Sequence, residues 1–210
     1  MVNHVVLLGD SIFDNAPYVG RAPDVVHQVR QWLPHGSKAT LRAVDGSTTE
    51  DVREQLRRLP TDATHLIVSA GGNDALNSSD FLSAPAHSTA EALMGLADIA
   101  NEFERRYHDM LTKVLAYKLP TAICTVYYPR FSDAALQRIA IAGLTVFNDC
   151  IIRAAIIYGL PLLDLRFICT EEGDYANPIE PSAQGGEKIA QAIVNLLEHG
   201  FTDGRTEVFI

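Results

Sequence analysis

The sequence predicts an α/β protein with a flavodoxin-like three-layer sandwich: a five-stranded parallel sheet with helices on both faces. Two observations support this class. Short apolar runs typical of buried strands alternate with longer segments in which apolar residues recur every three to four positions. The first three runs also end in turns that contain glycine, each followed by a helix-start pattern. The expected strand order, 2-1-3-4-5, comes from the fold class and not from the periodicity itself.

The elements of the first half repeat the order strand, turn, helix. Asp24 is a typical helix cap, and Ser47 with Glu50 has the spacing of a capping box. The predicted elements are a strand over 5–8, a helical turn over 12–15, a helix over 25–33, a strand over 39–44, a helix over 47–58 and a strand over 65–70.

The second half begins with a polar, irregular segment from Ala75 to Ser88. It is long for a connection inside a compact domain, so it is either a lid or binding loop or a surface excursion. The tail after Gly200 has no assignment. The further elements are a helix over 90–116, a strand over 121–126, a helix over 134–158, a strand over 160–163, an irregular stretch over 166–181 and a final helix capped by Ser182.

Composition narrows the class of protein. With 210 residues, 47% of them hydrophobic, and no linker or repeat, we expect one domain over 1–210. The net charge of −9 without a basic cluster argues against nucleic-acid binding. No basic leader or apolar run of transmembrane length is evident, so we expect no membrane span and a cytoplasmic location. The three cysteines form no C-x-x-C pair, which is typical of buried thiols rather than ligands.

Three predicted strand ends carry residues suited to acyl transfer: Ser11, Gly46 and Asn73. Ser11 would be the nucleophile, and the backbone N–H groups of Ser11 and Gly46 with the Asn73 amide would stabilise an oxyanion. Taken alone, Asp10 and Ser11 fit equally well as ordinary helix-capping residues. The case for chemistry therefore depends on the strand ends acting together.

The same edge could also suit two other kinds of site. A phosphate cradle is disfavoured because neither glycine-rich phosphate-binding motif occurs in the chain. A hard cation would need Asp10 and Asp14 together with Asn73 and Asp74. Capping explains these short carboxylates adequately, so we expect no metal and no cofactor.

The motifs resemble those of the SGNH/GDSL hydrolases. Gly9-Asp10-Ser11-Ile12-Phe13-Asp14-Asn15, Gly46 and Gly71-Gly72-Asn73-Asp74 are similar to the first three blocks of that family, and Asn177 to Ser182 with Gly185 is similar to the last. The resemblance implies a flavodoxin-like fold and a serine ester hydrolase acting on a small-molecule ester. It also implies that Ser11 is the nucleophile and that Gly46 and Asn73 are oxyanion donors.

The chain departs from the family where the base should be. The last block of the family reads Asp-x-x-His, whereas this chain has Asn177 and Glu180 at those positions. Glu180 could itself be the base if burial raises its pKa toward neutrality. Asn177 could then donate an amide hydrogen bond to the second carboxylate oxygen, where an aspartate would repel it.

Two alternatives to a glutamate base stay open. His87, in the segment after Asp74, could swing over the strand ends and supply an imidazole. The protein could instead bind an acylated or carbohydrate ligand without turning it over, because a fold does not fix a function. The candidates for substrate contact are Asp10, His87, Tyr127, Tyr128, Arg130 and the loop around Phe81 and Leu82.

Overall fold

The computed structural model describes residues 2–199, 201 and 205–210; the rest of the predicted domain, Met1, Gly200 and 202–204, lies outside the described residues. Its described strands form one parallel sheet in the order β2-β1-β3-β4-β5-β6. The predicted order of the first five strands is confirmed. The strands are β1 His4–Gly9, β2 Lys38–Leu41, β3 His65–Ser69, β4 Thr121–Cys124, β5 Leu162–Leu163 and β6 Val208–Phe209.

The expected number of five strands is one too few. The unassigned tail supplies β6, which pairs with β5 in the register Leu162 to Val208 and Leu163 to Phe209. A strand of two residues carries no alternation that a sequence reading could detect. The open edge of β5, which offers unpaired backbone groups, accounts for this pairing.

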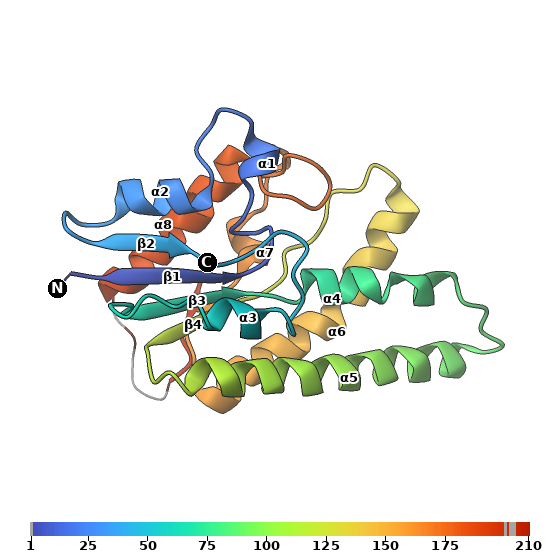
Figure 1. Ribbon diagram of the computed structural model, residues 1–210. Helices are drawn as coiled ribbons and strands as arrows, with labels where there is room; N and C mark the ends of the chain where they lie inside the picture. Colours follow the sequence, from blue (N-terminus) through green and yellow to red (C-terminus); the bar gives the residue numbers. More distant parts are fainter. Residues whose placement is uncertain (1, 200, 202–204) are drawn as a thin grey trace.

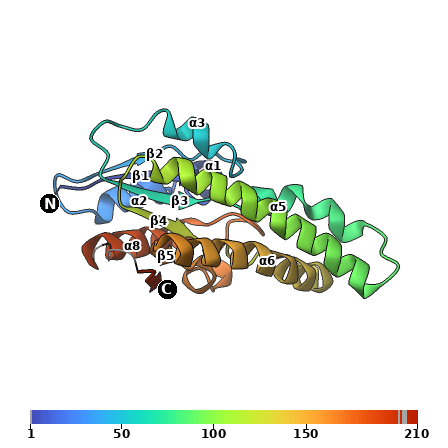
Figure 2. The same cartoon turned by 90° about the horizontal axis from the view of Figure 1, so that it is seen from below.

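Helices cover both faces of the sheet (Figures 1 and 2). The α2–α8 pair lies on one face, and α3, α5 and α6 lie on the other, where α5 and α6 extend well beyond the strands. The helices are α1 Ala16–Val19, α2 Val25–Trp32, α3 Val52–Leu56, α4 Gly72–Asn77, α5 Thr89–Leu115, α6 Ala134–Tyr158, α7 Leu165–Ile168 and α8 Ala183–His199, with short 3-10 helices η1 Ser79–Ser83 and η2 Glu172–Asp174.

Strand β1 shows how the core fixes the site. Val5 and Leu7 pack under α2 and α8, whereas Val6 and Leu8 pack under α3, α5 and α6, and none of the four is exposed. Burying one such side chain stabilises the fold by about 1.5–3 kcal/mol. The turn with Ser11 therefore follows a strand that is packed on both faces and paired on both sides, by β2 and β3.

Two predicted caps are confirmed, and one is wrong. Asp24 accepts the His27 N–H, and Ser182 accepts the Gly185 N–H, as helix caps do. The helix expected from Ser47 begins only at Val52. The Asp51 carboxylate accepts both the N–H and the hydroxyl of Thr48, which fixes residues 47–51 as turns.

The predicted second strand is also too long. It ends at Leu41 because the N–H groups of Arg42 and Ala43 both donate to the carbonyl of Leu7, at 2.8 and 2.9 Å. Two donors on one acceptor interrupt the ladder and turn the chain away from β1. The following loop, with Asp45 and Gly46, leaves the sheet here.

The segment expected to be irregular over 75–88 is largely helical. It continues α4 to Asn77 and forms η1, so that residues 84–88 alone connect to α5. The ring of Phe81 packs on Gly95 of α5 so closely that a Cβ at Gly95 would lie 2.5 Å from it. The sequence of this segment does not show a helical pattern of apolar residues, because most of its side chains face solvent.

One described helix, α6, meets the length and composition of a membrane span. Its most apolar window has a mean hydropathy of 1.7, and 33% of that window is buried. Several of its residues pack on α5 or line a cavity, as in a helix of the fold core. This helix does not indicate a membrane span.

Candidate active site

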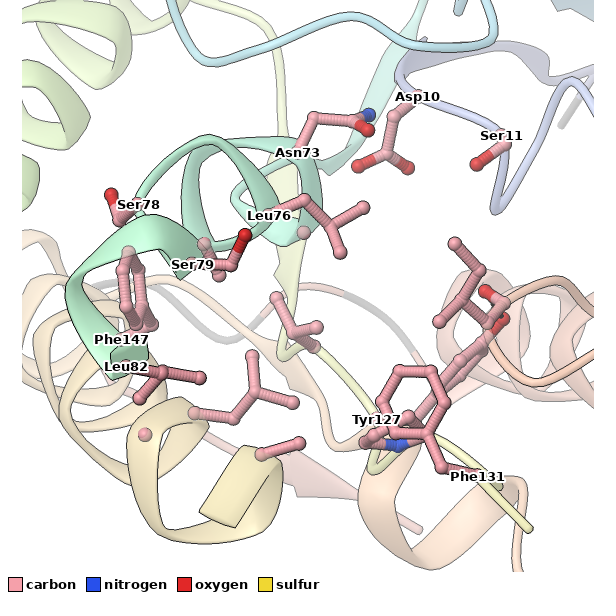
Figure 3. Close-up of a pocket in the computed structure, with 18 of the residues that line it drawn as sticks. Asp10, Ser11, Asn73, Leu76, Ser78, Ser79, Leu82, Tyr127, Phe131 and Phe147 are labelled. Carbon is pink, nitrogen blue, oxygen red and sulfur yellow. Dashed lines mark hydrogen bonds between the residues drawn. The ribbon is translucent and has the colours of Figure 1, made fainter. Parts of the chain in front are cut away.

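A cavity of about 180 Å³ opens at the carboxyl ends of β1 and β3 (Figure 3). Asp10, Ser11, Asn73 and Glu180 line its polar side. Most of the apolar wall comes from α4, η1, α5 and α6, and the segment after β4 adds Val126, Tyr127 and Phe131. The cavity therefore combines a few polar groups with a large apolar surface, which is the usual character of a small-molecule site.

The turn after β1 requires glycine at position 9. Gly9 has a φ of +125°, and a Cβ there would lie 1.6 Å from the Ser69 carbonyl oxygen of β3. The Asp10 N–H donates to that same carbonyl at 3.1 Å, and the Asp10 carbonyl accepts the N–H groups of Phe13 and Asp14. This tight turn presents Ser11 at the strand end, with its own N–H bonded to no acceptor among the described residues.

The other two predicted oxyanion donors lie on neighbouring loops. Asn73, at the start of α4, donates one amide hydrogen to the Ser47 carbonyl at 2.9 Å, which orients the side chain and leaves the second hydrogen free. Gly46 has a φ of +79° in the exposed loop between β2 and α3, and it does not line the cavity. In Figure 3 the side chains of Asn73, Asp10 and Ser11 lie along one side of the cavity.

Glu180 lies in the same cavity as Ser11 and is 6% exposed. Burial raises the pKa of its carboxyl to about 7; the Ser11 hydroxyl opposes this rise, and the charge of Asp45 adds to it. The Oε2 atom is buried without a hydrogen-bond partner in the described part of the chain. A buried carboxyl oxygen left without a donor is free to accept a proton.

Asn177 holds Glu180 differently from the expected arrangement. Its side-chain oxygen accepts the N–H groups of Ile179 and Glu180, each at 3.0 Å, and so forms a turn. The predicted hydrogen bond from the Asn177 amide to the Glu180 carboxylate is not formed. The hydroxyl of Tyr127 donates to the Ile179 carbonyl at 2.8 Å and braces the same turn from the cavity wall.

Two buried amides that the sequence reading missed connect the parts of the site. Asn15 donates to the Pro181 carbonyl at 3.2 Å and accepts the Val25 N–H at 2.9 Å, which ties the Ser11 turn to the segment of Glu180. Gln55 of α3 accepts the Gly9 N–H and donates to the Gly9 carbonyl, each at 2.8 Å. Asn15 ends the first quoted motif, whereas nothing in the sequence marks Gln55.

The remaining candidates for substrate contact separate into two groups. Tyr127, Phe81 and Leu82 line the cavity, whereas Tyr128, Arg130 and His87 do not. Arg130 is exposed and supports the loop before Glu180, with its N–H on the Pro178 carbonyl at 2.8 Å and its guanidinium 5.4 Å from the Tyr175 ring centre.

His87 is exposed before α5, and its N–H donates to the Glu91 carboxylate at 2.7 Å. None of the seven histidines of the chain lines the cavity that the described residues form.

Asp74 and Asp14, two of the carboxylates that could bind a cation, accept hydrogen bonds from neighbouring residues. Asp74 accepts the N–H and the hydroxyl of Thr49 at 3.0 and 2.8 Å, and Asp14 accepts the Asp45 N–H at 3.0 Å. Within the described ranges no group of three histidine, cysteine, aspartate or glutamate side chains could hold a metal ion. These bonds make Asp74 and Asp14 supports of the loops around the site.

Comparisons with known proteins agree with this arrangement of the fold. The model of the GDSL-like lipase/acylhydrolase family matches residues 7–188. A lipase from a goat rumen metagenome, Lip_vut3, is 16% identical with a TM-score of 0.71, over 98% of this chain and 100% of that chain. An extracellular lipase from Streptomyces rimosus is 18% identical with a TM-score of 0.64, over 96% and 100%.

A lipase/acylhydrolase from Enterococcus faecalis is 19% identical with a TM-score of 0.61, over 92% of this chain and 94% of that chain. At such identities the similarity shows a shared fold. A search of curated proteins gave no match.

Proposed function

Because this chain belongs to the GDSL-like lipase/acylhydrolase family, we propose that it hydrolyses a carboxylic ester through an acyl-Ser11 intermediate, with Glu180 as the base. Family membership supports an ester hydrolase in general. The observation that carries the finer proposal is a buried carboxyl with one unpartnered oxygen in the cavity of Ser11, which no histidine lines. A base of this kind supplies what the missing histidine would supply.

The proposed reaction proceeds in two transfers. The Ser11 oxygen attacks the ester carbonyl while its proton passes to Glu180, and the tetrahedral oxyanion receives hydrogen bonds from the Ser11 N–H and the Asn73 amide. Collapse of the intermediate breaks the ester C–O bond, and Glu180 returns the proton to the leaving alcohol. Water then attacks the carbonyl of the acyl-Ser11 ester while Glu180 takes its proton, and Glu180 returns that proton to the Ser11 oxygen as the carboxylic acid leaves.

The raised pKa of Glu180 makes this assignment chemically reasonable. At its ordinary pKa of 4.5 the carboxylate of Glu180 would be about two units less basic than a histidine. At about 7 it is roughly half ionised at neutral pH and at least as basic as an imidazole. Activity should therefore rise with pH through about 7, because the ionised carboxylate is the active form.

The cavity beyond Ser11 indicates an ester with an apolar acyl group. Leu76, Leu82 and Leu136 line it and are also 42–46% exposed, so they form an apolar rim at its opening. Phe147 and Leu144 lie among the further lining residues. Burial of methylene groups against such a wall contributes about 0.8 kcal/mol for each group.

The nucleophile is tested with p-nitrophenyl butyrate under burst conditions. The wild type should release one equivalent of p-nitrophenol quickly, and Ser11→Ala should lose both the burst and at least 1000-fold in turnover. Ser79→Ala is the matched control, since it removes another hydroxyl from the same cavity. Equal rates in Ser11→Ala and the wild type would overturn the proposal. Tight retention of an ester by an inactive wild type would instead identify a ligand-binding protein.

A further inference from the structure

Asp10 is a second buried acid in the cavity, and the proposed reaction has not used it. It is 3% exposed and lines the cavity with Ser11, Asn73 and Glu180. In Figure 3 its carboxyl lies between the side chains of Asn73 and Ser11. The oxyanion of the proposed intermediate is expected at this side of the cavity.

The two carboxyl oxygens of Asp10 have different surroundings. Oδ1 accepts the Ile12 N–H at 3.2 Å and so holds the turn. Oδ2 has no hydrogen-bond partner among the described residues, and it lies 3.7 Å from the position that a Cβ on Gly72 would occupy. Oδ2 therefore lies beside Gly72, which also lines the cavity.

No positive charge is present in the cavity to keep Asp10 ionised. The lining includes no lysine, arginine or histidine. The titratable groups that act on Asp10 are Glu180 before α8 and Asp74 of α4, and both disfavour a negative charge on it. Tyr107 of α5 and Cys124 of β4, behind it, are buried and have pKa values raised well above ordinary. Burial, with smaller contributions from the charges of Glu180 and Asp74, raises the pKa of Asp10 to about 8.

We propose that Asp10 is a further catalytic residue, which in its neutral form donates a hydrogen bond from Oδ2 to the oxyanion beside the Asn73 amide. This role rests on the proposed ester hydrolysis. It involves no proton transfer, because the acid keeps its hydrogen throughout. Ionised, the same group would repel the oxyanion, so its deprotonation should end activity at alkaline pH.

The decisive variant is Asp10→Asn, which keeps the size, the acceptor for the Ile12 N–H and a hydrogen-bond donor, but cannot ionise. The wild type should show a rise in kcat/KM near pH 7 and a fall near pH 8 with p-nitrophenyl butyrate. Asp10→Asn should keep its rate at pH 7 within about threefold and show no fall up to pH 9. Asp10→Ala, which removes the donor, should lose about 100-fold at pH 7.

Two results would overturn this role. A loss of 100-fold or more in a folded Asp10→Asn at pH 7 would mean that the ionised carboxylate is needed. An unchanged alkaline fall in Asp10→Asn would mean that Asp10 only supports the turn.

A second measurement separates this inference from the ester chemistry. If Asp10 is neutral in the folded protein, the melting temperature of the wild type should fall relative to Asp10→Asn as the pH rises from about 4 to 8, whether or not any ester is cleaved. A constant difference across that range would contradict a neutral Asp10. Activity that is absent in the wild type, with this melting difference intact, would instead count against the proposed hydrolysis alone.

Discussion

The polar side of the cavity and its apolar wall are built in different ways. Backbone turns at the ends of β1 and β3 and before α8 present Ser11, Asn73 and Glu180, and hydrogen bonds to Ser47 and Asn177 hold Asn73 and the Glu180 backbone in place. The apolar wall comes from helices that extend beyond the sheet, with packing as its main support (Figure 2). If the proposed ester hydrolysis holds, we expect the polar side to perform the chemistry and the apolar wall to select the acyl group.

The largest expected effect comes from replacing Glu180, and it distinguishes this proposed base from the alternative base, His87. Glu180→Gln keeps the shape of the side chain and removes its basicity, so kcat/KM should fall about 100- to 10,000-fold for short and long acyl chains alike. His87→Ala should leave the rate unchanged, because His87 does not line the cavity. The reverse ranking in a p-nitrophenyl ester assay would assign the base to the segment before α5.

A second change should act on the apolar wall alone. Gly143 of α6 lines the cavity and has open space where a Cβ would be placed, so Gly143→Leu should fill part of the acyl site. The kcat/KM for p-nitrophenyl octanoate should fall about 10- to 100-fold, while that for the acetate should change less than threefold. Ala142→Leu, at an exposed neighbour on the same helix, is the control. Equal losses of kcat/KM for the octanoate and the acetate would contradict the idea that the apolar wall selects the acyl group without affecting the chemistry.

The polar side should also carry a cost in stability. The folded pKa of Glu180, about 7, lies above its value of 4.5 in the unfolded chain, so its contribution is present below pH 4.5 and is lost as the pH rises to 7. Glu180→Gln avoids this loss. Allowing for solvent screening, the free energy of unfolding of the variant should exceed that of the wild type by about 2 kcal/mol at pH 8. At pH 4 the titration of Glu180 should contribute almost no difference between the two proteins. Urea titrations at both pH values test it.

The smallest expected effect concerns an acid on the same side that is fully bonded. Thr49→Val removes the hydroxyl that donates to Asp74 and keeps the shape of the side chain, which should cost about 1 kcal/mol of unfolding free energy. Turnover should change less than threefold, because Asp74 supports a loop and is not proposed to react. A loss of kcat greater than threefold in a folded Thr49→Val variant would indicate that Asp74 takes part in the reaction.

The sequence predicted most of the sheet because apolar strands and capping residues are local signals. It did not predict β6, which depends on the exposed edge of β5, or α4 and η1, whose residues are mostly polar. Ser11, Asn73 and Glu180 were placed at one edge by motif and strand order. The side-chain oxygen of Asn177 accepts backbone N–H groups and its amide does not donate to the Glu180 carboxylate, which depends on the shape of the turn and not on residue type.

The bond from Asn15 to the Pro181 carbonyl joins residues 166 positions apart in the chain. Ser11 follows β1 and Glu180 precedes α8, so the proposed nucleophile and base meet only once the segment before α8 docks on the Ser11 turn. A fragment ending before residue 177 should therefore be inert in ester cleavage even where β1 to β5 have paired.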